Sequence, residues 1–103
     1  HYINTVAYGN ADDGYKMSEE DGGDVVGMMV DAISRDNGGK GAVFEEENGG
    51  DVRVQVVDTH TVNNDDSDDT GLEIVQNDAG DGELIVEISR IEDGIDAEGV
   101  AVR

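Results

Sequence analysis

The sequence predicts a small, mainly β domain, an antiparallel sandwich or barrel of five to seven short strands, with one short helix near 24–36 as the α+β alternative. Three observations lead to this prediction. Apolar residues, chiefly valine, alternate with polar residues over short stretches, as they do in strands with one buried face. Glycine-rich turns separate these stretches at regular intervals. The 103 residues suit a single domain, 1–103, in which we identify no internal repeat.

The N-terminal third predicts a strand, a loop and an ambiguous segment. Residues 2–8 alternate in polarity and predict a strand, whereas the polar and acidic residues 10–23 predict a long loop. Residues 24–36 fit a helix, because four apolar residues fall on one stripe and Asp24 would serve as the N-cap. Those four residues are Val26, Met29, Val30 and Ile33. The same segment also fits a strand that is buried on both faces, and the helix is the favoured interpretation.

The stretch 42–62 predicts a β-hairpin around which a sheet would grow. A three-residue Asn-Gly-Gly loop would set Phe44 opposite Val54 and so give the hairpin an apolar face. The reverse face would set Glu45 opposite Arg53.

A second hairpin is predicted from 72–76 and 83–91, followed by a turn and a short final strand at 100–102. Pairing Ile74 with Val86 would place the large aliphatic side chains on one face. The predicted core consists of Phe44, Val54, Val56, Leu72, Ile74, Leu84, Val86 and Ile88.

Charge dominates the composition, because 26 Asp and Glu residues outnumber 6 Lys and Arg and give a formal net charge of -20. Such a chain repels itself in dilute buffer, whereas in molar salt the Debye length of about 3 Å turns its carboxylates into a hydrated coat. The composition resembles that of haloarchaeal proteins, which implies a habitat and no particular function. An acidic mesophilic domain that depends on bound cations or on a basic partner is the alternative.

Several function classes are disfavoured by what the sequence contains. There is no cysteine, which excludes disulfides and thiol catalysis. The longest apolar run, 25–30, is too short for membrane insertion. Clustered Lys and Arg, which a phosphate-binding face needs, are lacking, so we expect no nucleic-acid binding.

The acidic loop at 63–71 is the candidate metal site. Its candidate ligands are Asp65, Asp66, Asp68 and Asp69. Clustered carboxylates suit hard cations such as Ca²⁺, Mg²⁺, Na⁺ or K⁺. An EF-hand loop counted from Asp66 would have Asn77 where a bidentate glutamate is needed. Loosely bound cations are therefore the favoured interpretation, and we expect no required cofactor.

One histidine has the surroundings of a catalytic residue. Asp58 lies two residues before His60 on the same predicted strand face, where it could orient the imidazole. A third group is missing, so a half-exposed strand histidine is favoured. We predict no catalytic residue and no enzymatic activity.

The segment 22–49, GGDVVGMMVDAISRDNGGKGAVFEEENG, is similar to a pattern in small decoration (cement) proteins of tailed-virus capsids. In that pattern a strand with a Gly-Asp-Val-Val-Gly-like sequence precedes a glycine turn and a strand similar to KGAVF. The resemblance implies strand at 24–35 and carries over no functional residue.

These observations predict a non-enzymatic structural or assembly protein of a halophilic source, in a virion or another extracellular assembly. The alternative is an acidic interaction module, or a DNA mimic that binds a basic protein, and the alternative location is the cytoplasm of a halophile. The expected partners are copies of the chain or other proteins of the assembly, and we expect an oligomer. The predicted subunit contacts are Met28, Met29, Tyr2 and Tyr8.

Overall fold

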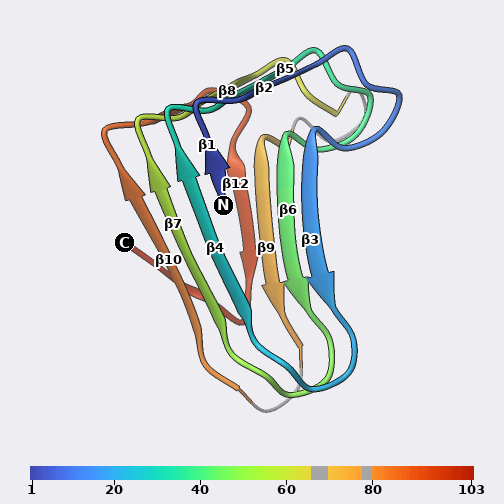
Figure 1. The fold of residues 1–103 in the computed structure, drawn as a ribbon, viewed down its shortest axis with the longest axis vertical. Helices are drawn as coiled ribbons and strands as arrows, with labels where there is room; N and C mark the ends of the chain where they lie inside the picture. The colour runs from blue at the N-terminus through green and yellow to red at the C-terminus, as the bar shows by residue number, and fades with distance from the viewer. Residues whose placement is uncertain (66–69, 78–79) are drawn as a thin grey trace.

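The structure, a computed structural model, describes residues 1–65, 70–77 and 80–103. It is a parallel β-solenoid in which each turn, called a coil from here on, adds one strand to each of three sheets (Figure 1). The predicted antiparallel sandwich or barrel is therefore wrong, and the described residues contain no helix. We call the three sheets A, B and C.

All neighbouring strands within a sheet are parallel. Sheet A contains β1 (Tyr2–Ile3), β4 (Val25–Val30), β7 (Val52–Val57), β10 (Gly82–Glu87) and β13 (Ala101–Val102). Sheet B contains β2 (Val6–Tyr8), β5 (Ile33–Arg35), β8 (His60–Val62) and β11 (Arg90–Ile91). Sheet C contains β3 (Tyr15–Glu19), β6 (Ala42–Glu46), β9 (Leu72–Gln76) and β12 (Ile95–Glu98).

The chain has an internal repeat, contrary to our prediction. Residues 27 apart occupy the same position in the first three coils, as Val25 and Val52 do in sheet A. The separation rises to 30 residues at Val52 and Gly82. Each coil therefore stacks on the previous one as a parallel neighbour, and the backbone hydrogen bonds of the long strands run between coils.

The predicted hairpin at 42–62 does not form. Phe44 lies in sheet C between Met17 and Ile74, whereas Val54 lies in sheet A between Gly27 and Leu84. The chain leaves sheet A at Asp58, whose φ of 46° bends it into sheet B. Alternation in polarity requires only that one face be buried, and it does not distinguish a hairpin partner from a strand of the next coil.

The other predicted elements need similar corrections. The favoured helix at 24–36 is replaced by β4 and β5, and the second hairpin fails because β9 and β10 belong to different sheets. A bend at Asn4 divides the predicted strand 2–8 into β1 and β2. Strand β3 lies within the predicted loop 10–23, and β12 lies where we predicted only a turn.

The core lies between the three sheets, and most of its predicted members are confirmed. The buried ones are Phe44, Val54, Val56, Leu72, Ile74 and Leu84. Val86 is half-buried against them, whereas Ile88 is 85% exposed at a bend, so its predicted place in the core is wrong. Met29, a predicted subunit contact, is instead fully buried. Position 27 faces inward, where a Cβ would lie only 2.7 Å from the Phe44 ring, so a glycine is needed there.

A ladder of side-chain amides ties the coils together where sheet B turns toward sheet C. The Nδ2 of Asn10 donates to Oδ1 of Asn37 at 2.8 Å, and Nδ2 of Asn37 donates to Oδ1 of Asn64 at 2.8 Å. Nδ2 of Asn64 donates to Oδ2 of Asp93 at 2.7 Å, which ends the ladder with a carboxylate. Asn37 and Asn64 are buried, so every coil depends on its neighbours to satisfy its polar groups.

Candidate functional site

The outward side of sheet A is a broad exposed face that carries many apolar side chains. Because side chains alternate along each strand, the residues between the buried ones point to solvent. We call these residues the sheet A outer face: Ile3, Val26, Met28, Val30, Arg53, Gln55, Val57, Glu83, Ile85, Glu87 and Ala101. Both of its carboxylates lie on β10, so β1, β4 and β7 contribute none.

The outward side of sheet C is different in charge. Its strands direct four carboxylates to solvent, those of Glu45, Glu73, Asp96 and Glu98. The contrast with sheet C matters because the chain has 26 acidic residues, and three adjacent strands of sheet A, β1 and the long β4 and β7, direct none of them outward. The short strands of sheet B direct no carboxylate outward either. Contiguous exposed apolar surface of this kind marks sites of interaction.

The outward side of sheet B also exposes apolar residues, but its cationic side chains are already engaged. Arg35 pairs with Asp36 at 3.0 Å and stacks over the Tyr8 ring at 4.2 Å. His60 and Arg90 both contact Glu92, the latter at 3.5 Å. Sheet B is also narrower, because its strands have at most three residues.

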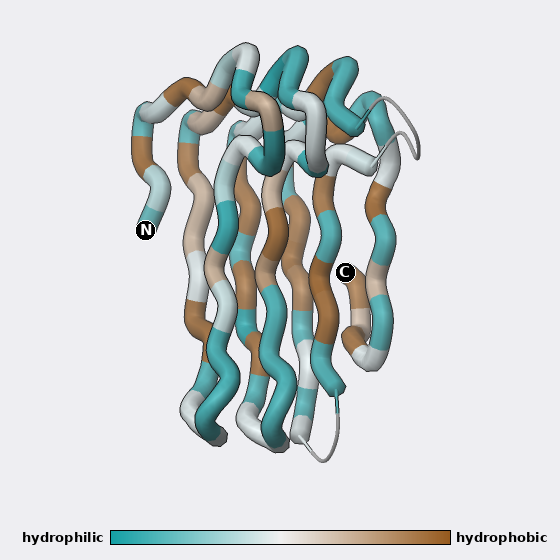
Figure 2. The backbone as a smooth tube through the Cα atoms, turned by 90° about the vertical axis from the view of Figure 1, so that its right-hand side faces the viewer, coloured by the Kyte–Doolittle hydropathy of each residue, from teal (hydrophilic) through white to brown (hydrophobic). Residues whose placement is uncertain are grey.

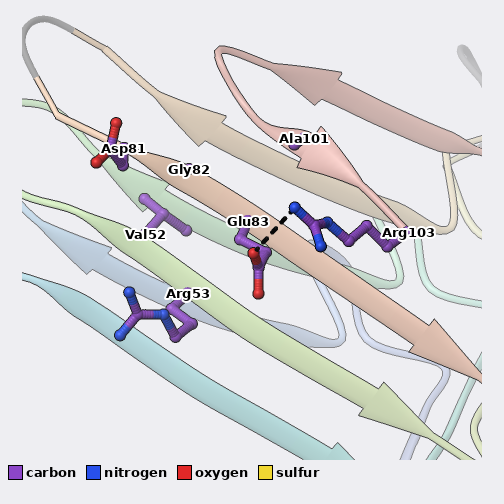
Figure 3. Close-up of a pocket in the computed structure, with 7 residues that line it drawn as sticks. All are labelled: Val52, Arg53, Asp81, Gly82, Glu83, Ala101 and Arg103. Carbon is purple, nitrogen blue, oxygen red and sulfur yellow. Dashed lines mark ion pairs between the residues drawn. The ribbon is translucent and has the colours of Figure 1, made fainter.

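A pocket of about 300 Å³ lies at the edge of the sheet A outer face (Figure 3). It is lined by Val52, Arg53, Asp81, Gly82, Glu83, Ala101 and Arg103. The Arg103 side chain reaches to 3.8 Å from Glu83, whereas the Arg53 guanidinium points away from that pair. A second hollow of about 160 Å³ shares Arg53 and Glu83 and extends along Val26, Met28 and Ile85.

Arg53 is one of two basic side chains that form no ion pair among the described residues. Four of the six Lys and Arg side chains lie within 4.0 Å of a carboxylate, namely Arg35, Lys40, Arg90 and Arg103. Arg53 and Lys16 have no such partner among the described residues. The predicted pairing of Arg53 with Glu45 is wrong, because Glu45 belongs to sheet C. The site thus combines an unpaired guanidinium with apolar neighbours on one flat sheet.

The predicted metal loop is only partly described. Asp66, Asp68 and Asp69 lie outside the described residues. Asp65 is buried, and its backbone N–H donates to the carbonyl of Asn37 at 3.0 Å. Burial alone would lower the pKa of Lys40, but the carboxylates of Glu73, Asp65 and Asp13 outweigh it and raise that pKa. In residues 1–65, 70–77 and 80–103 no three metal-ligating side chains converge.

His60 does not pair with Asp58, as the sequence suggested, but with Glu92 of the next coil. Asp58 occupies the bend before β8. The hydrogen bond from His60 lowers the pKa of Glu92. The pair is exposed on sheet B, and Glu92 holds Arg90 as well, so it links two coils electrostatically.

Stacked carboxylates line the turns that join sheet C to sheet A, which Figure 2 shows as largely hydrophilic. Oδ1 of Asp24 accepts the N–H of Asp51 at 2.9 Å, and Oδ1 of Asp51 accepts the N–H of Asp81 at 2.9 Å. Glu46 is fully buried beside them and accepts the N–H groups of Asn48 and Gly50 at 3.0 and 2.9 Å. Aligned coils therefore place like charges about 4.8 Å apart, the spacing of paired strands.

Sequence reasoning missed the sheet A outer face, although a signal for it was present. Comparing each residue with the one 27 positions later aligns Asp24 and Val25 with Asp51 and Val52. The same comparison places Val26 beside Arg53, and the two are neighbours on the sheet A outer face.

The fold and the site together define an acidic parallel β-solenoid with two carboxylate-poor sheet faces, of which the sheet A outer face has the longer strands. No protein-family model, curated protein or solved structure matches the chain. Within the part of the chain that the structure describes, no helix is long and apolar enough to span a bilayer.

Proposed function

We propose that this chain is a non-enzymatic structural protein that docks through its sheet A outer face onto a larger assembly in concentrated salt. One observation carries the proposal: sheet A is built on six-residue strands and still directs no carboxylate outward from β1, β4 and β7, in a chain that has 26 acidic residues. The partners we propose are copies of the chain or other proteins of the assembly. A virion or another extracellular particle of a halophile is the assembly that we favour.

The exposure of large aliphatic side chains on this face supports its burial against a partner. Val26 is 62% exposed and Ile3 is 55% exposed, while the half-buried Met28, Val30, Val57 and Ile85 complete the apolar surface. Removing apolar surface from water contributes about 25 cal/mol per Å², so a partner that covers these side chains gains stability from each. A chain with few large apolar residues would otherwise leave a good part of them in solvent.

The solenoid supports the proposal because it holds this face in a defined shape. The long strands of sheet A are hydrogen-bonded on both sides at β4, β7 and β10, and the amide ladder fixes the coils at the far corner. A surface that does not need to be ordered on binding loses less conformational entropy when a partner arrives.

The stacked carboxylates support concentrated salt as the working solvent. Two unit charges about 4.8 Å apart repel by about 0.9 kcal/mol in water, and molar salt screens most of that repulsion. In the column of Asp24, Asp51 and Asp81, the first two carboxylates each accept a backbone N–H from the next coil, which brings the charges together in the folded state.

Gradient sedimentation of a native extract in molar potassium chloride tests the proposal. We expect the tagged full chain to travel with large particles, and the Val26→Asp variant to remain near the top of the gradient. Val6→Asp is the matched control, since Val6 is 64% exposed on the other apolar sheet. Wild-type chain found only in the light fractions, or equal behaviour of the two variants, would contradict docking through sheet A.

A further inference from the structure

We infer that the partner on the sheet A outer face is a second copy of this chain, with Arg53 of each copy facing Glu83 of the other. This inference rests on the proposed function, because it names the occupant of the same face. It is carried by a juxtaposition of opposite charges and by the register of β7, β10 and β13.

Arg53 and Glu83 are direct neighbours across β7 and β10, and both point outward. No ion pair joins them, because the Arg53 guanidinium points away from Glu83 and Glu83 pairs with Arg103 (Figure 3). A twofold interface is self-complementary when residue i of one copy meets residue j of the other, and j meets i. Adjacent opposite charges on one face satisfy that condition.

A twofold axis parallel to the strands and midway between β7 and β10 produces this arrangement. The rotation keeps the strand direction, reverses the order of the coils and brings the two sheets face to face at about 10 Å, the usual spacing of stacked sheets. It places Arg53 opposite Glu83 and Glu83 opposite Arg53.

The same rotation also fixes which neighbouring positions meet. The row of outward residues at the level of Arg53 consists of Val26 on β4, Arg53 on β7, Glu83 on β10 and Ala101 on β13. Reversing it sets Val26 against Ala101 at both ends, so two apolar side chains flank each pair of charges. In the next row Gln55 would lie against Ile85, the two residues that are partners across β7 and β10.

Charge favours a second copy over a basic partner at this face. The row carries one positive and one negative charge, whereas the chain as a whole carries a formal charge of -20. Two copies therefore meet here without net repulsion within the row, and a basic protein would be drawn to the carboxylates at the turns instead. Opposite charges across an interface also select one register over others.

The size of the face predicts a weak dimer. Strands of six residues span about 20 Å, and four strands span about 19 Å, so each copy offers about 400 Å² of flat area. The total of about 800 Å² is below the 1,200–2,000 Å² of typical stable complexes. We expect reversible association at high protein concentration in molar salt, strengthened where an assembly holds many copies together.

Charge exchange within one chain tests the inference by sedimentation equilibrium of the purified protein in molar potassium chloride. Arg53→Glu and Glu83→Arg should each weaken dimerisation by about tenfold or more, because each creates two like-charge contacts buried in the interface, where salt screens them much less than at the exposed turns. The double variant Arg53→Glu/Glu83→Arg should restore the dimer to within a few-fold of the wild type. Val6→Asp should leave the dissociation constant unchanged, and circular dichroism should confirm that every variant is folded.

Three results would overturn the inference. These are a wild-type chain that stays monomeric at high concentration, an Arg53→Glu variant that dimerises as well as the wild type, and a double variant no better than the single ones. If the purified chain is monomeric but the wild type and not Val26→Asp travels with particles, the second copy is excluded and docking through sheet A stands. If neither behaviour is found, both proposals fail.

Discussion

The second and fourth coils of the solenoid occupy equivalent positions in the three sheets but are held there by different interactions. In the second coil, Asn37 hydrogen-bonds to both neighbouring coils and Asp31 makes the bend between sheets A and B with a φ of 51°. Asp and Asn adopt this left-handed conformation more readily than other non-glycine residues. Polar residues thus serve both corners at little conformational cost.

The fourth coil departs from this pattern at the same positions. Ile88 takes the place of Asp31 at the bend, also with a φ of 51°, which is strained for a β-branched residue. Asp93 takes the place of the ladder asparagine and accepts two hydrogen bonds from Asn64 and one from Thr61 at 2.5 Å. Strand β12 is exposed along its whole length.

The difference shows how stability is distributed along the solenoid. Inner coils have a neighbour on both sides, and their buried polar groups are satisfied by those neighbours. The fourth coil has a complete neighbour only on the β7–β9 side, and β13 covers part of β10 on the other. In a repeat architecture stability is a sum of such nearest-neighbour terms, so we expect the described C-terminal coil to open first.

The largest effect is expected from removing the centre of the amide ladder. Asn37→Ala removes the hydrogen bonds that Nδ2 donates to Oδ1 of Asn64 and to Oγ of Ser34 in the buried corner, at a cost of about 3 kcal/mol or more. Asn10→Ala, at the exposed end of the ladder, should cost much less. Urea unfolding in molar salt, followed by circular dichroism, measures both. Equal losses would show that burial of the ladder does not matter.

The sequence predicted individual strands but not how they pair, and the amide ladder illustrates the reason. The segments 42–46, 52–57 and 72–76 were found as strands, because alternation in polarity is a local property of one face. Their partners were not found, since parallel stacking depends on residues about 27 positions apart. Asn10, Asn37 and Asn64 hold that spacing in the sequence, but the longer third coil and the shortened fourth conceal the period.

The next effect concerns the strained bend of the fourth coil. Ile88→Asn should stabilise the protein by about 1 kcal/mol, because asparagine tolerates the left-handed conformation and an 85% exposed isoleucine loses little packing. Hydrogen exchange should show slower opening of β10 and β11. The same change at Val6, which is exposed in a strand, is the control and should not stabilise. A destabilised Ile88→Asn would mean that the isoleucine is held by contacts of its own.

The candidate site was harder to predict than the strands. Alternation marks Val26, Arg53 and Glu83 only as outward residues, and three separate segments must align before they form a surface. The sequence prediction instead set Arg53 against Glu45, because it assumed a hairpin. Charge composition was sufficient to predict an acidic surface. The register of sheet A was needed to locate the part of that surface where outward carboxylates are few.

A smaller effect is expected at the column of stacked carboxylates. Asp51→Asn removes the central charge while its Oδ1 can still accept the N–H of Asp81. In dilute buffer this should stabilise the fold by about 1 kcal/mol, since two repulsions of roughly 0.9 kcal/mol each are relieved in a partly screened setting. In molar salt the gain should vanish. Thermal melts across a salt series measure the difference, and a gain that persists in molar salt would contradict a screened repulsion.

The smallest effects should come from two exposed glutamates with opposite pKa shifts. A hydrogen bond with Glu45, together with its charge, raises the pKa of Glu47, whereas the hydrogen bond from His60 lowers that of Glu92. Ionised Glu92 therefore contributes stability above its ordinary pKa of 4.5, and this is lost as the pH falls through the lowered value. Folding favours the protonated form of Glu47, so the stability that this group contributes is present below pH 4.5 and is lost as the pH rises through the raised pKa.

The two glutamates should therefore respond in opposite directions to neutralisation. At neutral pH in dilute buffer, Glu47→Gln should raise the melting temperature slightly and Glu92→Gln should lower it. Melts from pH 3 to 7 should show both effects fading in acid, and shifts of the same sign for the two variants would contradict the assignment.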